Sequence, residues 1–81
     1  MKYVMLETKD GARLPFIFPD SMTHSVVAAY VKHMLEEIHK LGDVKAASAG
    51  FVNLGTDVEV HGESESLGGL KSNPYDAARI V

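Results

Sequence analysis

Two apolar runs at the start of the chain predict a β-hairpin. Residues 2–8 hold an unbroken apolar run, so both faces of this strand are apolar, which is typical of a central strand covered on two sides. Asp10 and Gly11 follow, and Asp-Gly is the strongest short hairpin signal. Residues 12–18 form the returning strand, in which Pro15 favours a sheet edge because proline cannot donate to a ladder. One face of this strand carries Leu14, Phe16 and Phe18.

The next part of the chain predicts one amphipathic helix. Asp20, Ser21 or Thr23 can cap its start, and Gly42 is suited to its end. Charged residues fall mostly on the side opposite the apolar positions. Those apolar positions recur at helical spacing: Val27, Tyr30 or Val31, Met34, Ile38 and Leu41.

A second pair of strands follows the helix. Residues 44–54 form an extended region in which Gly50 is a candidate bulge. A turn at residues 54–57 leads to a short strand at 58–61, with Val58 and Val60 facing inward. The long strand places on one face Val44, Ala46, Ser48, Gly50 and Val52.

The pattern breaks after Gly62. Residues 63–69 form a polar loop that contains glycines. Ser72 or Asn73 then resembles a helix cap, with Pro74 at the first helical position. We expect residues 75–81 to form one or two helical turns or to dock as an extended tail.

This order of elements predicts one α+β domain over residues 1–81, with a ββαββ arrangement. We expect an antiparallel sheet of about four strands, one main helix and a short C-terminal helix or tail. One helix covers only one face of the sheet, whereas the first strand is apolar on both. Either the C-terminal segment covers the second face or a second subunit does, and we favour a homodimer.

Length, charge and composition narrow the function classes. A chain of 81 residues has a thin core. The net charge is −3 and the eight Lys and Arg are scattered, whereas nucleic-acid binders usually carry a basic stripe. We therefore expect no nucleic-acid partner. The absence of cysteine excludes disulfides and thiol catalysis. No signal peptide or membrane span is visible, so we expect a cytoplasmic protein.

No constellation for catalysis or metal binding is visible. The four histidines are scattered, whereas zinc needs three or four converging ligands. Residues 62–66 resemble a nucleophile elbow but lack its final glycine, and that motif belongs to a much larger sheet. Residues 68–72 resemble a phosphate-binding loop, but Leu70 separates Gly69 from Lys71. We therefore expect no enzyme activity, no cofactor and no metal.

Three stretches resemble a known group of proteins: residues 14–20, residues 48–52, and residues 62–76 with their Gly-Glu-Ser-x-Ser-Leu and Lys-Ser-x-Pro-x-Asp patterns. The chain is similar at these places to small uncharacterised proteins encoded by tailed phages and prophages of proteobacteria. The resemblance implies an intracellular accessory protein, and such proteins often bind a host component.

The best hypothesis is therefore a non-enzymatic accessory protein that binds a host protein, as a homodimer. The alternative is a binding protein for a small molecule or nucleotide derivative, with a pocket in the segment 62–75. A purely structural role for this segment is equally possible, with Leu67, Leu70, Tyr75 and Ile80 in the core. The candidate binding residues are His61, Glu63, Ser64, Ser66, Asn73 and Tyr75.

Overall fold

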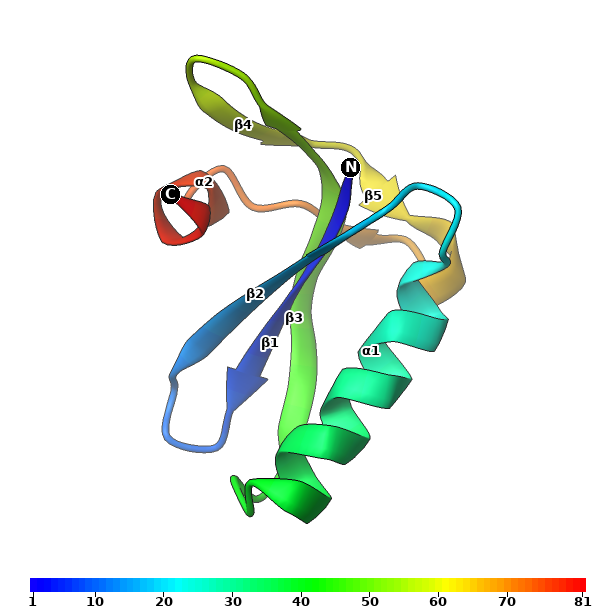
Figure 1. The fold of residues 1–81 in the computed structure, drawn as a ribbon, viewed down its shortest axis with the longest axis vertical. Helices are drawn as coiled ribbons and strands as arrows, with labels where there is room; N and C mark the ends of the chain where they lie inside the picture. Colours follow the sequence, from blue (N-terminus) through cyan, green and yellow to red (C-terminus); the bar gives the residue numbers. More distant parts are fainter.

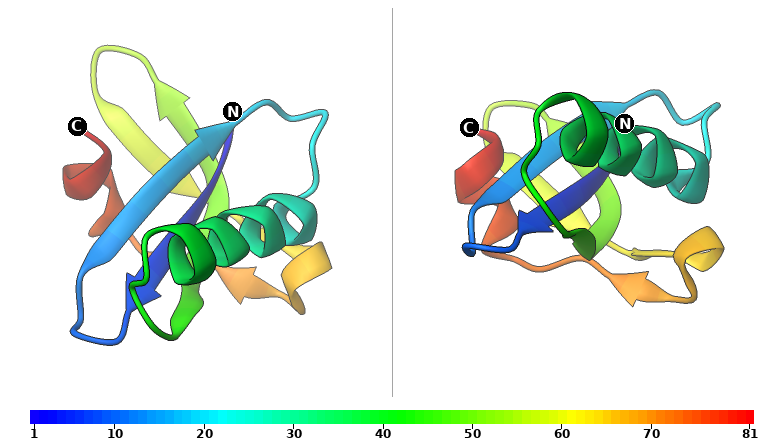
Figure 2. Two further views of the ribbon diagram at one scale, coloured as in Figure 1. Left: turned by 60° about the horizontal axis from the view of Figure 1, so that its bottom comes forward. Right: turned by 90° about the horizontal axis from the view of Figure 1, so that it is seen from below.

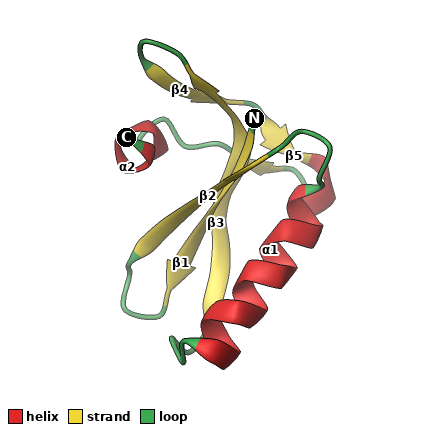
Figure 3. Cartoon of the chain, viewed as in Figure 1, coloured by secondary structure: helices red, strands yellow, loops and turns green.

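The computed structural model describes all 81 residues and confirms an α+β fold. The chain begins with two strands and a helical region, continues into one long strand, and ends in a series of short elements (Figures 1 and 3). In chain order the elements are β1 (Lys2–Thr8), β2 (Arg13–Phe18), α1 (His24–His33), the π-helical turn η1 (Met34–Ile38), β3 (Val44–Leu54), β4 (Val58–His61), β5 (Glu63–Ser64), the 3-10 turn η2 (Glu65–Leu67), β6 (Leu70–Lys71) and α2 (Asp76–Ile80).

The main sheet has four antiparallel strands in the order β2-β1-β3-β4, and β5 pairs with β6 in a separate hairpin. As predicted, β1 is central and β2 is an edge. The Thr8 amide donates to the Ala12 carbonyl oxygen at 2.8 Å. Because antiparallel ladders alternate, the amide positions of Arg13, Pro15 and Ile17 face outward. Pro15 therefore costs no ladder bond and removes one donor from the free edge.

Helix α1 and η1 cover one face of the sheet (Figures 1 and 2). Val4 and Leu6 of β1 are fully buried there against the inner side of the helix. The predicted face of β2 is confirmed, because Phe18 is buried in this cluster and Leu14 and Phe16 pack on it. The helix contributes to this core Val27, Ala28, Val31 and Leu35.

The C-terminal segment covers the second face of the sheet. Tyr3, Met5 and Val52 are buried there, and Ile80 of α2 packs against them. The predicted inward residues of β4, Val58 and Val60, pack on the same cluster. Of the two possibilities left by the sequence, the chain's own tail is therefore the one observed. This face gives no reason for a second subunit.

A bulge in β3 changes the prediction for that strand. Met5 pairs with Ser48 whereas Leu6 pairs with Ala46, so Ala47 is an extra residue. Beyond it the side chains exchange faces: Val44 and Ala49 lie on the helix side and Val52 on the opposite side. The prediction that residues 44–52 keep one alternation was wrong, and the bulge lies at Ala47 instead of Gly50.

The end of the main helix also departs from the prediction. Residues 34–38 form a π turn, whose five-residue hydrogen-bond spacing adds one residue to the turn. Ile38 is consequently 68% exposed, and Leu41 is exposed as well. Of the alternatives Tyr30 and Val31, Val31 is the buried one and Tyr30 is 69% exposed. Regular α-helical spacing does not hold beyond Leu35, so Ile38 and Leu41 were wrongly placed in the core.

Candidate functional site

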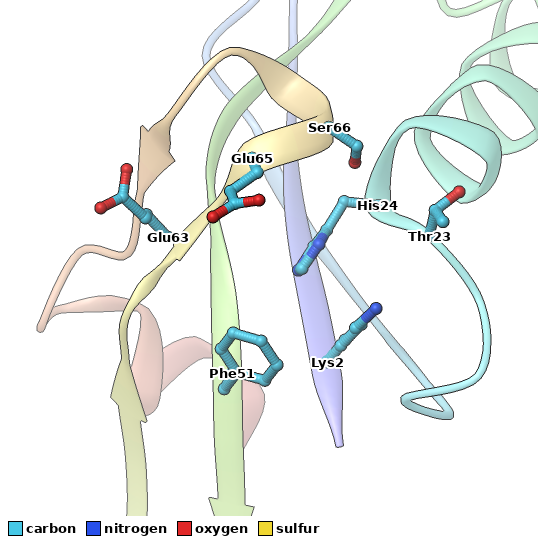
Figure 4. Close-up of a pocket in the computed structure, with 7 residues that line it drawn as sticks. All are labelled: Lys2, Thr23, His24, Phe51, Glu63, Glu65 and Ser66. Carbon is cyan, nitrogen blue, oxygen red and sulfur yellow. The ribbon is translucent and has the colours of Figure 1, made fainter.

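A polar hollow of about 690 Å³ opens at the N-terminal end of α1, on the helix side of the sheet. Four separate parts of the chain build its wall (Figure 4). Six of the seven lining side chains are polar or charged. They are Lys2 of β1, Thr23 and His24 at the start of α1, Phe51 of β3, and Glu63, Glu65 and Ser66 of the β5–η2 segment.

His24 is the most enclosed side chain of this wall, with only 3% of its surface exposed. Its Nε2 lies 2.8 Å from the Gly50 carbonyl oxygen. A carbonyl oxygen only accepts, so Nε2 carries a proton, and in the corresponding neutral tautomer Nδ1 is an acceptor. The edges of two phenyl rings hold the imidazole in place, with centroid distances of 5.3 Å to Phe18 and 5.9 Å to Phe51. His24 therefore presents a fixed acceptor in an almost dry position.

The charged side chains of the wall point in different directions (Figure 4). The Glu65 carboxylate lies across the hollow from the His24 ring, whereas the Glu63 carboxylate points away from it. The Lys2 ammonium donates to the Met22 carbonyl oxygen at 2.8 Å, beside the loop that enters α1. The interior of the hollow is thus dominated by acceptors.

Two of the predicted site residues have structural roles as caps. The Ser66 hydroxyl accepts a hydrogen bond of 3.0 Å from the Ser25 amide in the first turn of α1. Thr23 occupies the N-cap position but forms no side-chain cap bond, so Ser66 replaces the expected local cap from 41 residues away. The Ser64 hydroxyl accepts from the Leu67 amide and caps η2.

The remaining predicted residues do not form one site. His61 stacks on Phe51 with a centroid distance of 5.8 Å. Asn73 accepts from the Tyr75 amide at 3.0 Å, which shapes the turn before α2, and the Tyr75 side chain is 81% exposed. Only Glu63 and Ser66 of the six candidates line the hollow. Asn73 lies on the opposite face, where its backbone N–H donates to the Tyr3 hydroxyl.

A buried polar cluster on that opposite face was missed. The Asp76 carboxylate is fully buried and accepts from the hydroxyl of Tyr3 at 2.8 Å and from that of Ser48. Its other oxygen has no hydrogen-bond partner and lies 4.0 Å from the Arg13 guanidinium. Burial, and then the bond to Asp76, raise the pKa of the Tyr3 hydroxyl far above its usual value. The cluster joins α2 to β1, β2 and β3.

Comparison with protein-family models, curated proteins and solved structures finds no match for this chain. The resemblance to phage-encoded proteins therefore stays a prediction. No helix is long and apolar enough to cross a membrane. No three His, Cys, Asp or Glu side chains gather as metal ligands would.

Sequence reasoning missed most of the hollow's wall. It overlooked Lys2, Thr23, His24, Phe51 and Glu65, because these residues come from parts of the chain that only the fold brings together. One signal was present: His24 directly begins an apolar helix, on the side that carries the buried Val27 and Val31. A histidine on the buried side of a helix needs a polar partner, and here that partner is the Gly50 carbonyl.

Proposed function

We propose that this protein is a non-enzymatic binding protein whose hollow accepts a cationic Lys or Arg side chain of a protein partner. The observation that carries the proposal is the enclosed His24 ring, which lies across the hollow from the Glu65 carboxylate. Ammonium and guanidinium groups offer several N–H donors and no acceptor. Such a group satisfies both acceptors at once.

The aromatic wall favours the same ligand chemistry. The Phe51 ring lines this space, and His61 stacks on one of its faces. A cation above a phenyl face gains roughly 0.5–1 kcal/mol at an exposed site and more when it is desolvated. The one cation of the wall, Lys2, is already directed at the Met22 carbonyl oxygen. The net charge of −3 supports docking on a basic surface.

Two serines of the segment 62–75 support a non-catalytic role. The hydroxyl oxygens of Ser64 and Ser66 both accept backbone amides. An oxygen that accepts such a bond is a poorer nucleophile, and neither serine has a hydrogen bond to a histidine. A phage accessory protein that binds a host component would use such a surface, and the host partner is part of this proposal.

An NMR titration with the tripeptide Gly-Arg-Gly tests the proposal. We expect chemical-shift changes at the amides next to Glu65, His24 and Phe51, and none with the citrulline peptide, which has the same shape without the charge. Glu65→Gln should weaken binding about ten-fold or more, because hydrogen bonds to charged groups are worth about 1.5–3 kcal/mol.

The matched control is Glu59→Gln, which removes the same charge from an exposed position of β4 outside the hollow. It should leave the titration nearly unchanged. Equal responses to the arginine and citrulline peptides, or equal effects of the two variants, would overturn the proposal.

The second candidate is a small molecule in the same hollow. Its volume lies within the range of small-molecule pockets. Titrations with free arginine, spermidine and a nucleoside monophosphate separate the two candidates. Binding of a free cation more tightly than of the peptide favours a small-molecule ligand. A response to the nucleotide alone contradicts a cation site.

A further inference from the structure

The outer side of helix α1 carries an apolar stripe of three exposed side chains. Val26, Tyr30 and Ile38 are 62%, 69% and 68% exposed, and no other element lies over this side of the helix (Figures 1 and 2). The inner side of the same helix is apolar and buried. Large apolar side chains gathered on the exposed side of a helix mark a surface that a partner commonly covers.

The sequence explains why both sides are apolar. Residues 26–31 read Val-Val-Ala-Ala-Tyr-Val, so each pair contributes one side chain to the core and one to the outside. The π turn adds to the effect, because it turns Ile38 away from the core and toward solvent. We name these three residues, Val26, Tyr30 and Ile38, the outer stripe.

We propose that a second copy of this chain covers the outer stripe, with the two α1 helices antiparallel about a two-fold axis. In the register that sets Val26 against Ile38 of the other copy, Tyr30 faces Met34 and lies next to His33. Every contact then occurs twice, as a two-fold interface requires. Such a pairing buries the apolar side chains that the single chain leaves exposed.

Charge favours this antiparallel arrangement. The first turn of α1 has no acidic residue, whereas Glu36 and Glu37 follow near its other end. Antiparallel pairing brings Glu37 of each copy near the N-terminal turn of the other helix. A carboxylate there is stabilised by the helix dipole, typically by 0.3–1 kcal/mol. A parallel pair would instead place the two Glu37 side chains together.

Two other surfaces of the fold offer less to a second copy. The tail already buries the second sheet face. The free edge of β2 lacks one donor at Pro15, which hinders pairing with another strand. The outer stripe gathers three exposed, mainly apolar side chains on one side of a helix, and such patches mark interaction sites. A stable interface buries roughly 800 Å² per partner, so the pairing must also include the polar residues around the stripe.

Sedimentation at several concentrations, combined with engineered cysteines, tests this inference. We expect wild-type protein to dimerise and Tyr30→Ser to raise the dissociation constant roughly thirty-fold, as for a central aromatic contact. The matched control is Tyr75→Ser, which removes an even more exposed tyrosine outside the stripe and should leave the dimer intact. Circular dichroism of both variants verifies that they remain folded.

Cysteines then locate the interface, because the natural chain has none. Residue 33 lies near the proposed two-fold axis. The His33→Cys variant should therefore form a disulfide dimer quickly under mild oxidation, whereas the Tyr75→Cys variant should not. Three results would each overturn the inference: a monomer at about 0.1 mM, a dimer that Tyr30→Ser does not weaken, or equal cross-linking of the two cysteine variants.

Discussion

Replacing Asp76 by alanine should remove a large part of the stability of this fold. The carboxylate has no exposed surface and accepts the hydroxyl hydrogens of Tyr3 and Ser48. Alanine leaves both hydroxyls without this acceptor and leaves the Arg13 guanidinium with only one of its two neighbouring carboxylates, that of Glu7. Removing one partner of a buried charged group costs about 3–5 kcal/mol. A domain of this size has a total free energy of unfolding of about 4–12 kcal/mol.

Urea unfolding followed by circular dichroism measures this loss. Asp76→Asn should cost less, about 1–2 kcal/mol, because the amide oxygen still accepts a hydroxyl while the charge opposite Arg13 is lost. The control Asp57→Ala removes an exposed carboxylate from the turn between β3 and β4 and should change stability by less than about 0.5 kcal/mol.

Hydrogen exchange separates two ways in which the loss can occur. If only the tail undocks, amides of α2 lose protection while those of β1 retain it. A loss below about 1 kcal/mol for Asp76→Ala, with α2 still protected, would refute the conclusion that this carboxylate holds the tail on the sheet.

Two further predictions concern alkaline pH and a close backbone approach. The pKa of the Tyr3 hydroxyl is raised in the folded state, so the protonated hydroxyl contributes its full stability to the fold below about pH 10. Above that pH the free energy of unfolding falls by up to about 1.4 kcal/mol per pH unit. Urea midpoints between pH 9 and 11 should therefore fall more steeply for wild type than for Tyr3→Phe, and equal slopes contradict this. Gly50→Ala places a Cβ 2.5 Å from the His61 carbonyl oxygen and should cost at least about 2 kcal/mol in the same unfolding assay, whereas Gly55→Ala meets open space and should be nearly neutral.

The elements of the fold were predictable where local pattern decides them. The apolar run of β1, the Asp-Gly turn and the position of Pro15 each correctly placed part of the hairpin. The departures come from single extra residues in the backbone. The bulge at Ala47 and the π turn before Ile38 both displace the side chains that follow, and periodicity in the sequence carries no sign of either.

The functional features were not predictable for a different reason. His24 meets Gly50 across 26 residues, and Ser66 meets Ser25 across 41. Such pairs depend on the completed topology, so a scan for local motifs sees only isolated polar residues. Of the candidates predicted in the segment 62–75, only Glu63 and Ser66 line the hollow. The serines of this segment cap helical turns, and Glu65, which was not predicted, faces the hollow.

The position of Asp76 has a consequence for how the protein is made. Tyr3 is synthesised well before its partner, which follows 73 residues later. Until then, the second face of β1 stays open to water and to other nascent chains. Contacts of such long sequence separation slow folding, and the exposed intermediate is prone to aggregation.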